Sequence, residues 1–448
     1  MITKTSFSPA RGWLIWGIAT LFVVYQLMMQ NGFGAIAGNV QTDLGLSIAG
    51  MGMLSASFLI VYSLMQLPVG LILDRTDARW VLGLSAIACG LLVYVFAQMD
   101  SLWSALAIRA CIGGAAAFAF TGAGVLARRW IRPTQFALAM GLIDMSFGLG
   151  AVIGDAGFSM YLQHGTWRTL LEQMALVGIA IGVLSLLFIR NRPTPGALGA
   201  PGKREMAVTL RQSLAELSRS RQVWLAMVFY AGTCGTMFSF GGLWNIKLQE
   251  AFGFSTTDSI TLNSLLFLGM GLTAPIWGWL SDRTGRRKPF LVAGAIGSAC
   301  MSSVIIFTPW APYGVVAGVM VVYGVFLGTS VLIFAAVCER IKREYSGAAI
   351  GIVNASGCFF GGVLQIAPTL MGGADQSEHI EVFQRAMSIF FVFHILALIA
   401  ALMLHDSRPG WAREQAHELD AGGNGPPATQ DGPDGPRTAP APSAGLPS

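Results

Sequence analysis

Long apolar stretches recur along the whole chain, and they constrain its fold more than any other feature. Many of them exceed the ~20 residues that a helix needs to cross ~30 Å of hydrocarbon. Only 11% of the 448 residues are charged and 54% are hydrophobic, whereas about 25% are charged in a typical soluble domain. The sequence therefore predicts an all-α membrane protein with twelve transmembrane helices. The predicted spans are 12–34, 49–73, 80–98, 101–127, 136–161, 170–189, 223–246, 260–281, 288–307, 311–337, 347–370 and 384–404.

Basic residues orient these spans. If both termini are cytoplasmic, 24 of the 28 Lys and Arg residues lie on the cytoplasmic side, whereas Arg168, Lys247 and Arg385 lie outside and Arg109 lies within a span. This asymmetry follows the positive-inside rule. We therefore predict a multi-pass protein of the plasma membrane (the bacterial inner membrane) with both termini cytoplasmic. The net charge of +5 then reports topology and does not indicate a nucleic-acid partner.

The spans fall into two sets of six that are separated by a polar loop. The predicted parts are a cytoplasmic N-terminus (1–11), an N-terminal six-helix bundle (12–189), a cytoplasmic linker loop (190–222), a C-terminal six-helix bundle (223–404) and a disordered cytoplasmic tail (405–448). The tail is rich in Gly and Pro, a composition that favours disorder.

Signatures of enzymes and metal proteins are not found in the sequence. The six cysteines show no CxxC or Cys/His ligand spacing. There is no phosphate-binding Gly-x-x-x-x-Gly-Lys loop, zinc motif or nucleophile elbow. The sequence therefore predicts neither an enzyme nor a metal or cofactor site. The expected partners are a small-molecule substrate, protons and the lipid bilayer, and the chain is expected to be a monomer.

One loop pattern occurs twice, 208 residues apart, between apolar spans. Its members are Gly70, Asp74, Arg75 and Arg79 in the first copy and Gly278, Asp282, Arg283, Gly285, Arg286 and Arg287 in the second. The repeat continues at an offset of 210, which aligns Asp144 with Asn354 and Asp155 with Gln365. Such duplication predicts two pseudo-symmetric bundles around a central site, which is the layout of secondary transporters.

Over residues 12–404 the chain resembles a major facilitator superfamily transporter. The loop copies are similar to the family signature Gly-x-Leu-x-Asp-Arg-x-Gly-Arg-Arg, although Asp77 and Ala78 replace a Gly-Arg pair in the first copy. Arg109 and Gly113 in the fourth span resemble a second family motif, Arg-x-x-x-Gly. The resemblance implies a transporter whose span-four arginine takes part in proton coupling.

The antiporter motif of the same family differs from this sequence. It would place Gly-Pro near the middle of span five, where this chain has Gly154 and Asp155. This departure favours uptake over efflux.

Charged residues within the spans are the candidates for transport and proton coupling, because each costs ~2.5–3.5 kcal/mol to insert. Arg109 and Asp155 lie 22 residues before and 24 residues after the turn near residue 131, so antiparallel neighbouring helices would place them at similar depth. We predict an Arg109–Asp155 pair that substrate or proton disturbs; a static salt bridge between two helices is the alternative. Asp144 has no obvious basic partner and is a candidate proton carrier. Alternatively, it stays protonated and hydrogen-bonded to backbone.

Polar and aromatic residues in the central spans are predicted to line the substrate cavity, since the first helix of each half flanks the central path in the family that the chain resembles. The predicted lining residues are Tyr25, Gln26, Gln30, Tyr230, Asn245, Asn354 and Gln365. Hydrogen bonds between helices would use the same residue types. Lys247 is expected to anchor the outer interface, and His394 to be packed or lipid-facing.

The duplicated loop motif is predicted to gate the transporter. Asp74 and Asp282 would latch the inner ends of the two halves in one state through helix ends and basic neighbours such as Arg340, with Glu339 joining in the second half. The alternative is a purely structural loop.

Together these features predict a secondary transporter that works by alternating access. The preferred hypothesis is proton-coupled uptake of a small polar solute that bears a carboxylate, such as an organic acid, an amino acid or a short peptide. Proton-antiport efflux of drugs or metabolites is the alternative. A sensor would need a signalling domain and a channel would conduct without a proton gradient.

Overall fold

The computed structural model describes residues 9–131, 133–190, 210–309, 311–341, 345–371 and 380–406. The chain divides into one compact unit that runs to Arg408 and a second unit, Pro409–Ser448. The second unit lies outside the described residues, as does most of the predicted linker loop. The regular elements of the described residues are all helical.

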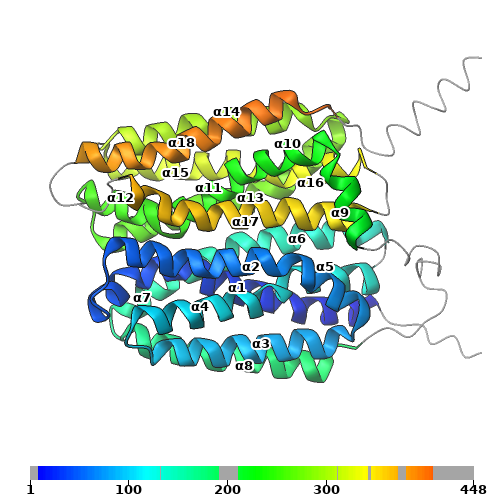
Figure 1. Cartoon of the computed structure of the whole chain (residues 1–448), viewed down its shortest axis with the longest axis horizontal. Coiled ribbons are helices and arrows are strands. Elements are labelled where there is room, and N and C mark those ends of the chain that lie inside the picture. Colours follow the sequence, from blue (N-terminus) through cyan, green and yellow to red (C-terminus); the bar gives the residue numbers. More distant parts are fainter. Residues whose placement is uncertain are drawn as a thin grey trace, which may run out of the picture. The chain divides into compact units, whose positions relative to one another are not determined.

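Six spans make up the N-terminal half of the molecule, and they run between the same two ends of the bundle (Figure 1). The third and sixth spans pack closely along their lengths. The elements are α1 (Pro9–Asp43), α2 (Ile48–Arg75), α3 (Ala78–Ala97), α4 (Leu102–Ala116) with α5 (Phe118–Trp130), α6 (Pro133–Val152) with η1 (Ile153–Gly157) and α7 (Phe158–Leu162), and α8 (Trp167–Phe188).

The C-terminal half repeats this arrangement. A short helix, α9 (Leu210–Ser218), precedes it and packs on α10 and α17. The elements are α10 (Arg221–Tyr230), η3 (Ala231–Gly235), α11 (Thr236–Ser239), η4 (Phe240–Trp244) and α12 (Asn245–Ala251) in the seventh span, α13 (Thr256–Thr284), α14 (Lys288–Phe307), α15 (Tyr313–Leu327) with η5 (Gly328–Val331) and α16 (Leu332–Cys338), α17 (Ser346–Leu370) and α18 (Ile380–Met403).

Eleven helical segments in the described residues are long and apolar enough to cross a membrane. The twelfth span is the segment α6–η1–α7. The predicted all-α fold with twelve transmembrane helices in two bundles is confirmed. Several helices are longer than the predicted spans; α1 covers Pro9–Asp43 where 12–34 was expected, because a helix continues into polar sequence beyond the hydrocarbon.

The two halves begin their second helix with the same local device. Gly45 and Gly253, which are 208 residues apart, both have positive φ values, of 58° and 93°, a conformation that glycine adopts without steric cost. Two residues later, Ser47 and Ser255 cap the next helix by accepting a backbone hydrogen bond. The sequence repeat is therefore also a structural repeat.

Two ends of the helices can be distinguished by charge. We call the end with the loops near 75–79 and 283–288 the basic end, and the end with the loops near 43–48 and 251–256 the opposite end. Figure 1 shows α2 of the first half beside α17 of the second. Further contacts between halves join α6 and η1 to α13, and α1 and α2 to η4.

Candidate functional site

Close glycine contacts join the two halves from the middle of the helices toward the opposite end. A Cβ atom on Gly34 of α1 would lie 2.6 Å from the carbonyl oxygen of Gly242 in η4. One on Gly148 of α6 would lie 2.8 Å from the Cα atom of Gly271 in α13. Such small residues let helix backbones approach closely in a membrane. The halves are therefore closed against each other in this region.

Toward the basic end, three glycines of α2, α13 and α17 have open space beside them. Cβ atoms on Gly70 of α2, Gly278 of α13 and Gly351 of α17 would meet no atom within 4 Å. The basic-end parts of the fourth and tenth spans, α5 and α16, pack on helices of their own halves. The halves are thus closed at one end only, which is the arrangement of one state in alternating access.

Asp155 lies in this closed region and contacts the other half. Its side chain is fully buried, and its Oδ2 atom accepts a hydrogen bond of 2.7 Å from Nδ2 of Asn263 in α13. Asn263 also donates to the carbonyl oxygen of Gly241 at 2.7 Å and accepts from Asn245 at 2.8 Å. Asn263 was not among the predicted site residues, because an amide in an apolar span carries no sequence signal for its partner.

Arg109 lies inside the N-terminal half and is buried. Its guanidinium carbon is 3.7 Å from the centre of the Phe33 ring, and the rings of Phe58 and Phe96 are 5.5 and 5.9 Å away. Aromatic faces attract a guanidinium by the cation–π interaction. The Nε atom has no hydrogen-bond partner.

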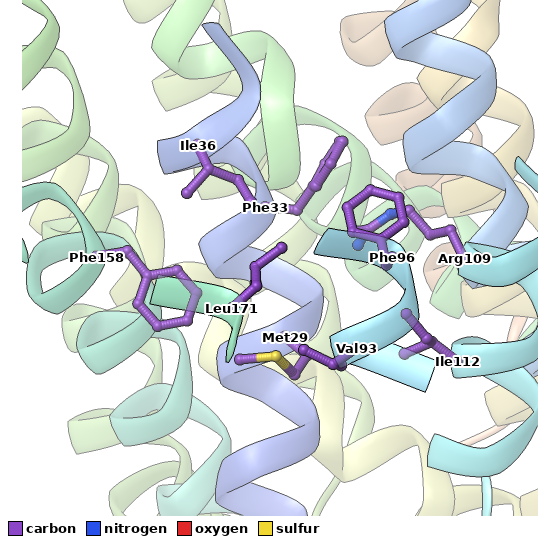
Figure 2. A pocket seen from close by; sticks show the side chains of 9 residues that line it. All are labelled: Met29, Phe33, Ile36, Val93, Phe96, Arg109, Ile112, Phe158 and Leu171. Carbon is purple, nitrogen blue, oxygen red and sulfur yellow. The ribbon is translucent and has the colours of Figure 1, made fainter. Parts of the chain in front are cut away.

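A small cavity adjoins this arginine (Figure 2). Its volume is about 10 Å³, which is near the space needed for one water molecule. Figure 2 shows side chains from several helices of the N-terminal half around it. The lining residues are Met29, Phe33, Ile36, Val93, Phe96, Arg109, Ile112, Phe158 and Leu171.

The predicted Arg109–Asp155 ion pair is wrong for this structure. Arg109 is surrounded by aromatic rings within its own half, whereas Asp155 bonds to Asn263 in the other half. The prediction correctly assumed that both lie toward the opposite end. Depth along a helix, however, does not determine the direction in which a side chain points around the helix axis.

Hydrogen bonds between and within helices engage most of the predicted cavity residues. Gln26 donates to Gln30 at 2.7 Å, and Tyr230 of α10 lies 3.5 Å from the Asn354 oxygen of α17. Tyr25 lies against α8 in its own half, because its hydroxyl oxygen would be 2.6 Å from a Cβ atom on Gly178. Tyr25 therefore faces the interior of the N-terminal half.

The amides of Asn245 and Gln365 belong to contacts near the opposite end. The side-chain amide of Gln365 donates to the backbone carbonyl oxygen of Phe238, and the backbone carbonyl oxygen of Gln365 accepts from the indole N–H of Trp244. A Cβ atom on Gly52 of α2 would lie 2.6 Å from that carbonyl oxygen. Gln365 therefore lies at the contact between α2 and α17, which joins the two halves. The sequence repeat aligns this position with that of Asp155.

Three predicted site residues have side chains outside the described part of the structure. They are Asp144 in α6 and Asp74 and Arg75 at the end of α2. Their proposed roles therefore remain predictions.

The second copy of the loop motif forms an ion-pair cluster. Arg287 is buried, and its Nη2 atom lies 2.6 Å from Asp282 and 3.1 Å from Glu339. Gly285 ends α13 with a φ of 66°, and Arg283 lies over the ring of Trp279. These contacts all lie within the C-terminal half. Asp282 thus forms no latch between halves in this state.

Arg79 of the first copy is also bound within its own half. Arg79 donates to the carbonyl oxygen of Leu186, and Asp77 caps α3 by accepting from the Arg79 N–H group. Arg79 of the first copy and Arg287 of the second therefore each stabilise the basic end of a single half.

Asp406 completes the basic-end cluster of the second half. It accepts hydrogen bonds from the backbone N–H groups of Lys288 and Arg287 and pairs with Arg286 at 2.9 Å. Burial acts to raise the pKa of the Asp406 carboxyl, but these hydrogen bonds and the Arg286 charge outweigh burial and hold the pKa below its usual value.

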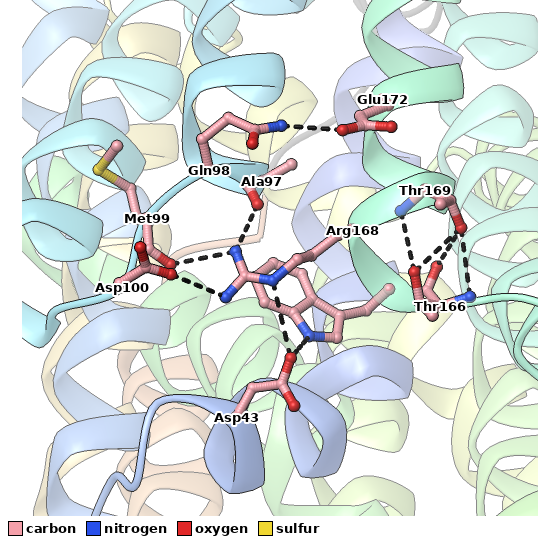
Figure 3. Close-up of polar contacts among 10 residues, drawn as sticks. Asp43, Ala97, Gln98, Met99, Asp100, Thr166, Arg168, Thr169 and Glu172 are labelled. Carbon is pink, nitrogen blue, oxygen red and sulfur yellow. Dashed lines mark hydrogen bonds and ion pairs between the residues drawn. The ribbon is translucent and has the colours of Figure 1, made fainter.

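A polar cluster fastens the opposite end of the N-terminal half (Figure 3). Arg168 of α8 pairs with Asp100 at 3.1 Å and with Asp43 at 3.7 Å, and Trp167 donates to Asp43 at 2.8 Å. The cluster thus joins the ends of α1, α3 and α8.

His394 of α18 is fully buried, so it is packed and does not face lipid. Its Nε2 atom lies 2.8 Å from the hydroxyl of Tyr323, and its Nδ1 atom lies 3.2 Å from that of Thr236. These partners come from the tenth and seventh spans, so the histidine joins three spans of the C-terminal half.

The sequence pattern of the Major Facilitator Superfamily matches residues 16–366. The membrane sensor protein UhpC of Salmonella typhimurium is 24% identical over 421 residues, which cover 90% of this chain and 93% of that protein. A putative tartrate transporter of Agrobacterium vitis is 26% identical over 298 residues, which cover 62% of this chain and 67% of that protein.

A solved structure has the same fold. It is a bacterial homologue of the human lysosomal transporter Spinster, in an inward-facing and unoccupied conformation. Its TM-score is 0.69 at 16% sequence identity, and the match covers 89% of this chain and 98% of that one.

Proposed function

The chain belongs to the Major Facilitator Superfamily, and from this premise we propose that it takes up a small carboxylate-bearing solute together with protons. Family and fold make it a multi-pass membrane transporter of a small molecule and not an enzyme. Uptake, proton coupling and the carboxylate are the steps that we add.

The observation that carries the proposal is the one-sided closure between the halves. Gly34 touches Gly242 near the opposite end, while Gly70 and Gly278 have open space beside them near the basic end. A central site would then be open toward the basic end in this state and toward the opposite end in the other. The excess of Lys and Arg at the basic end supports a cytoplasmic location for that end and for both termini.

The class of substrate rests on charge. Arg109 is the one cationic side chain that the described residues place well inside a span, and it forms no ion pair there. Tartrate, the solute in the name of one relative, carries carboxylates, which pair well with a guanidinium. We assign anion coupling to Arg109 and the coupled proton to Asp144, and we propose that Asp155 takes part in the cycle through its protonation state.

The polar side chains of the central helices would orient the solute. We retain Gln26, Gln30, Tyr230 and Asn354 as the cavity lining, because all four lie on the spans that flank the path between the halves. The loop motifs would open and close the basic end.

The test is uptake into proteoliposomes that hold the purified protein, with an acidic outside and a neutral inside. Labelled tartrate should accumulate, neutral glycerol should not, and a protonophore should abolish accumulation. Loss of trapped tartrate on imposing the same gradient would instead support the efflux alternative. Uptake that is indifferent to the gradient would contradict proton coupling.

Asp144→Asn tests the proton carrier. The variant should still bind and exchange tartrate, because the amide keeps the size of the side chain, but its uptake should lose pH dependence. Counterflow, which needs no net proton movement, provides the matched measurement. Gradient-driven accumulation equal to that of the unmodified protein would contradict the assignment.

A second candidate function is sensing, because the UhpC relative that matches over 90% of this chain is named a membrane sensor. A sensor would bind its ligand saturably without moving it. Ligand-induced thermal stabilisation together with no counterflow would favour this function over transport.

A further inference from the structure

Asn263 holds the two halves together in one defined geometry. Its Nδ2 atom donates to Asp155 in the first half and to the carbonyl oxygen of Gly241 in the second, each at 2.7 Å. Its Oδ1 atom accepts from Asn245 at 2.8 Å. Both amide hydrogens and the amide oxygen are therefore used, and the side chain is fully buried.

On both sides of this contact the α-helix is interrupted by a π-helical turn. Asp155 lies in the π-helical turn η1, and Gly241 lies in the π-helical turn η4. Turns of this kind interrupt the regular hydrogen-bond pattern and are frequent at functional sites. Close contacts with α1 surround the site, since a Cβ atom on Gly32 would lie 3.0 Å from the Cα atom of Gly154.

The carboxyl group of Asp155 is fully buried, and no cationic side chain of the described residues forms an ion pair with it. Its Oδ2 atom accepts one hydrogen bond, from Asn263, and its Oδ1 atom has no hydrogen-bond partner. An ionised carboxylate without a cation is strongly disfavoured in such surroundings. The protonated form of Asp155 is therefore favoured while the opposite end is closed.

The elements packed against η1 are α1, α6, α7 and α13. Most of their charged and titratable side chains lie at the far ends of the helices. Tyr25 lies against Gly178 of α8, and the side chain of Asp144 in α6 is outside the described residues. Lys247 of the nearby α12 pairs with Glu250. Apart from Asp144, the charged and titratable side chains of the packed elements are those of Arg11, Tyr25 and Asp43 in α1, Tyr161 in α7, and Asp258, Asp282 and Arg283 in α13.

We propose that protonated Asp155 and Asn263 form a latch that holds the opposite end closed, and that opening of this end releases the proton to the side it faces. This inference rests on the proposed alternating access. A proton that exchanges with one side only controls the state of the protein and is not carried across the membrane, so the proton that drives uptake is assigned to Asp144. The contact of Gly148 with Gly271 lies between Asp155 and the basic end. The proton of Asp155 therefore exchanges with one side only, and Asp155 senses the pH of that side.

The test is a distance measurement by electron spin resonance on the full-length chain without substrate, in a background that lacks the native cysteines. Spin labels at Thr42→Cys and Thr257→Cys, both exposed, report the opposite end. Labels at Thr76→Cys and Thr284→Cys report the basic end.

Asn263→Ala should shift the equilibrium about tenfold toward an open opposite end, as expected for losing one buried hydrogen bond. Ser264→Ala is the matched control on the same helix, because Ser264 bonds only within α13, and it should leave the distances unchanged. Equal distances in the two variants would overturn the latch.

A second measurement follows the same spin-label distances as a function of pH, and it does not require that the Asn263→Ala variant folds. In the unmodified protein, raising the pH should favour opening by up to about tenfold per pH unit, since the closed state binds one more proton. Asp155→Asn keeps an acceptor for Asn263, so it should stay closed at every pH. Opening of this variant, or a pH-independent opposite end in the unmodified protein, would overturn the proposal. Either result stands apart from the uptake assay, because no substrate is present.

Discussion

The two ends of the molecule differ in the contacts that join its two halves. At the opposite end, Asp155 bonds to Asn263 and Gly34 touches Gly242, and both contacts join one half to the other. At the basic end, the ion pairs centred on Arg287 join elements of a single half.

This difference separates two functions of the contacts. Contacts that cross between halves determine which end is closed, so changing them should alter the balance between states. Contacts within a half make that half move as a rigid body, so changing them should alter stability and leave the balance alone. The predictions below test this separation.

The largest effect is expected at Arg109, which lies toward the closed end but inside one half. Arg109→Ala should abolish uptake in proteoliposomes while the protein still elutes as a folded monodisperse species, because the cation–π contacts contribute only ~2 kcal/mol. Arg109→Lys keeps the charge without the planar stacking on Phe33 and should retain part of the activity. Full activity of the alanine variant would remove Arg109 from the transport mechanism.

Gly34→Ala should destabilise the closed state by ~1–3 kcal/mol, since its Cβ atom would lie 2.6 Å from backbone of the other half. Gly70→Ala is the matched control at the basic end, where the new Cβ atom meets open space. Thermal unfolding and spin-label distances measure both variants. Equal changes in melting temperature and in spin-label distances for the two variants would contradict the proposed difference between the two ends.

Arg287→Ala should lower the stability of the C-terminal half by on the order of 1–2 kcal/mol, because the ion pairs of Arg287 with Asp282 and Glu339 are lost. Spin-label distances at the opposite end should not change. Arg283→Ala serves as a control, because Arg283 is exposed. A change in those distances with Arg287→Ala would show that the basic-end cluster also sets the state.

The smallest effect is expected at Asp406, whose pKa is held below its usual value. A depressed folded-state pKa stabilises the fold above the pKa of the unfolded chain, and this contribution is lost as the pH falls below about 4. Solvent screening limits it to less than ~1 kcal/mol. The melting temperature of Asp406→Asn should therefore differ from that of the unmodified protein at pH 7 and converge with it at low pH.

Local patterns predicted the fold because they depend on one helix at a time. Apolar length located the spans, and the recurrence of Gly45 and Ser47 as Gly253 and Ser255 gives each half the same turn. The alignment of Asp155 with Gln365 also indicated equivalent positions, and both residues lie at contacts between halves.

The partners of these residues could not be predicted in the same way. Counting residues gave the depth of Arg109 and Asp155 but not their orientation around the helix axes, so the expected pair was wrong. The role of Asn263 could not be predicted from the sequence, because it depends on the hydrogen-bonding groups that the tertiary structure places opposite its amide.

The amino-acid sequence by itself determined the number of membrane crossings, the doubling of the bundle and the charge difference between its ends, since hydrophobic length and charge placement act locally along the chain. Only the tertiary structure decided which end is closed and which side chains meet across the halves. Those outcomes depend on helix rotation, on π-helical turns and on backbone contacts between residues more than a hundred positions apart.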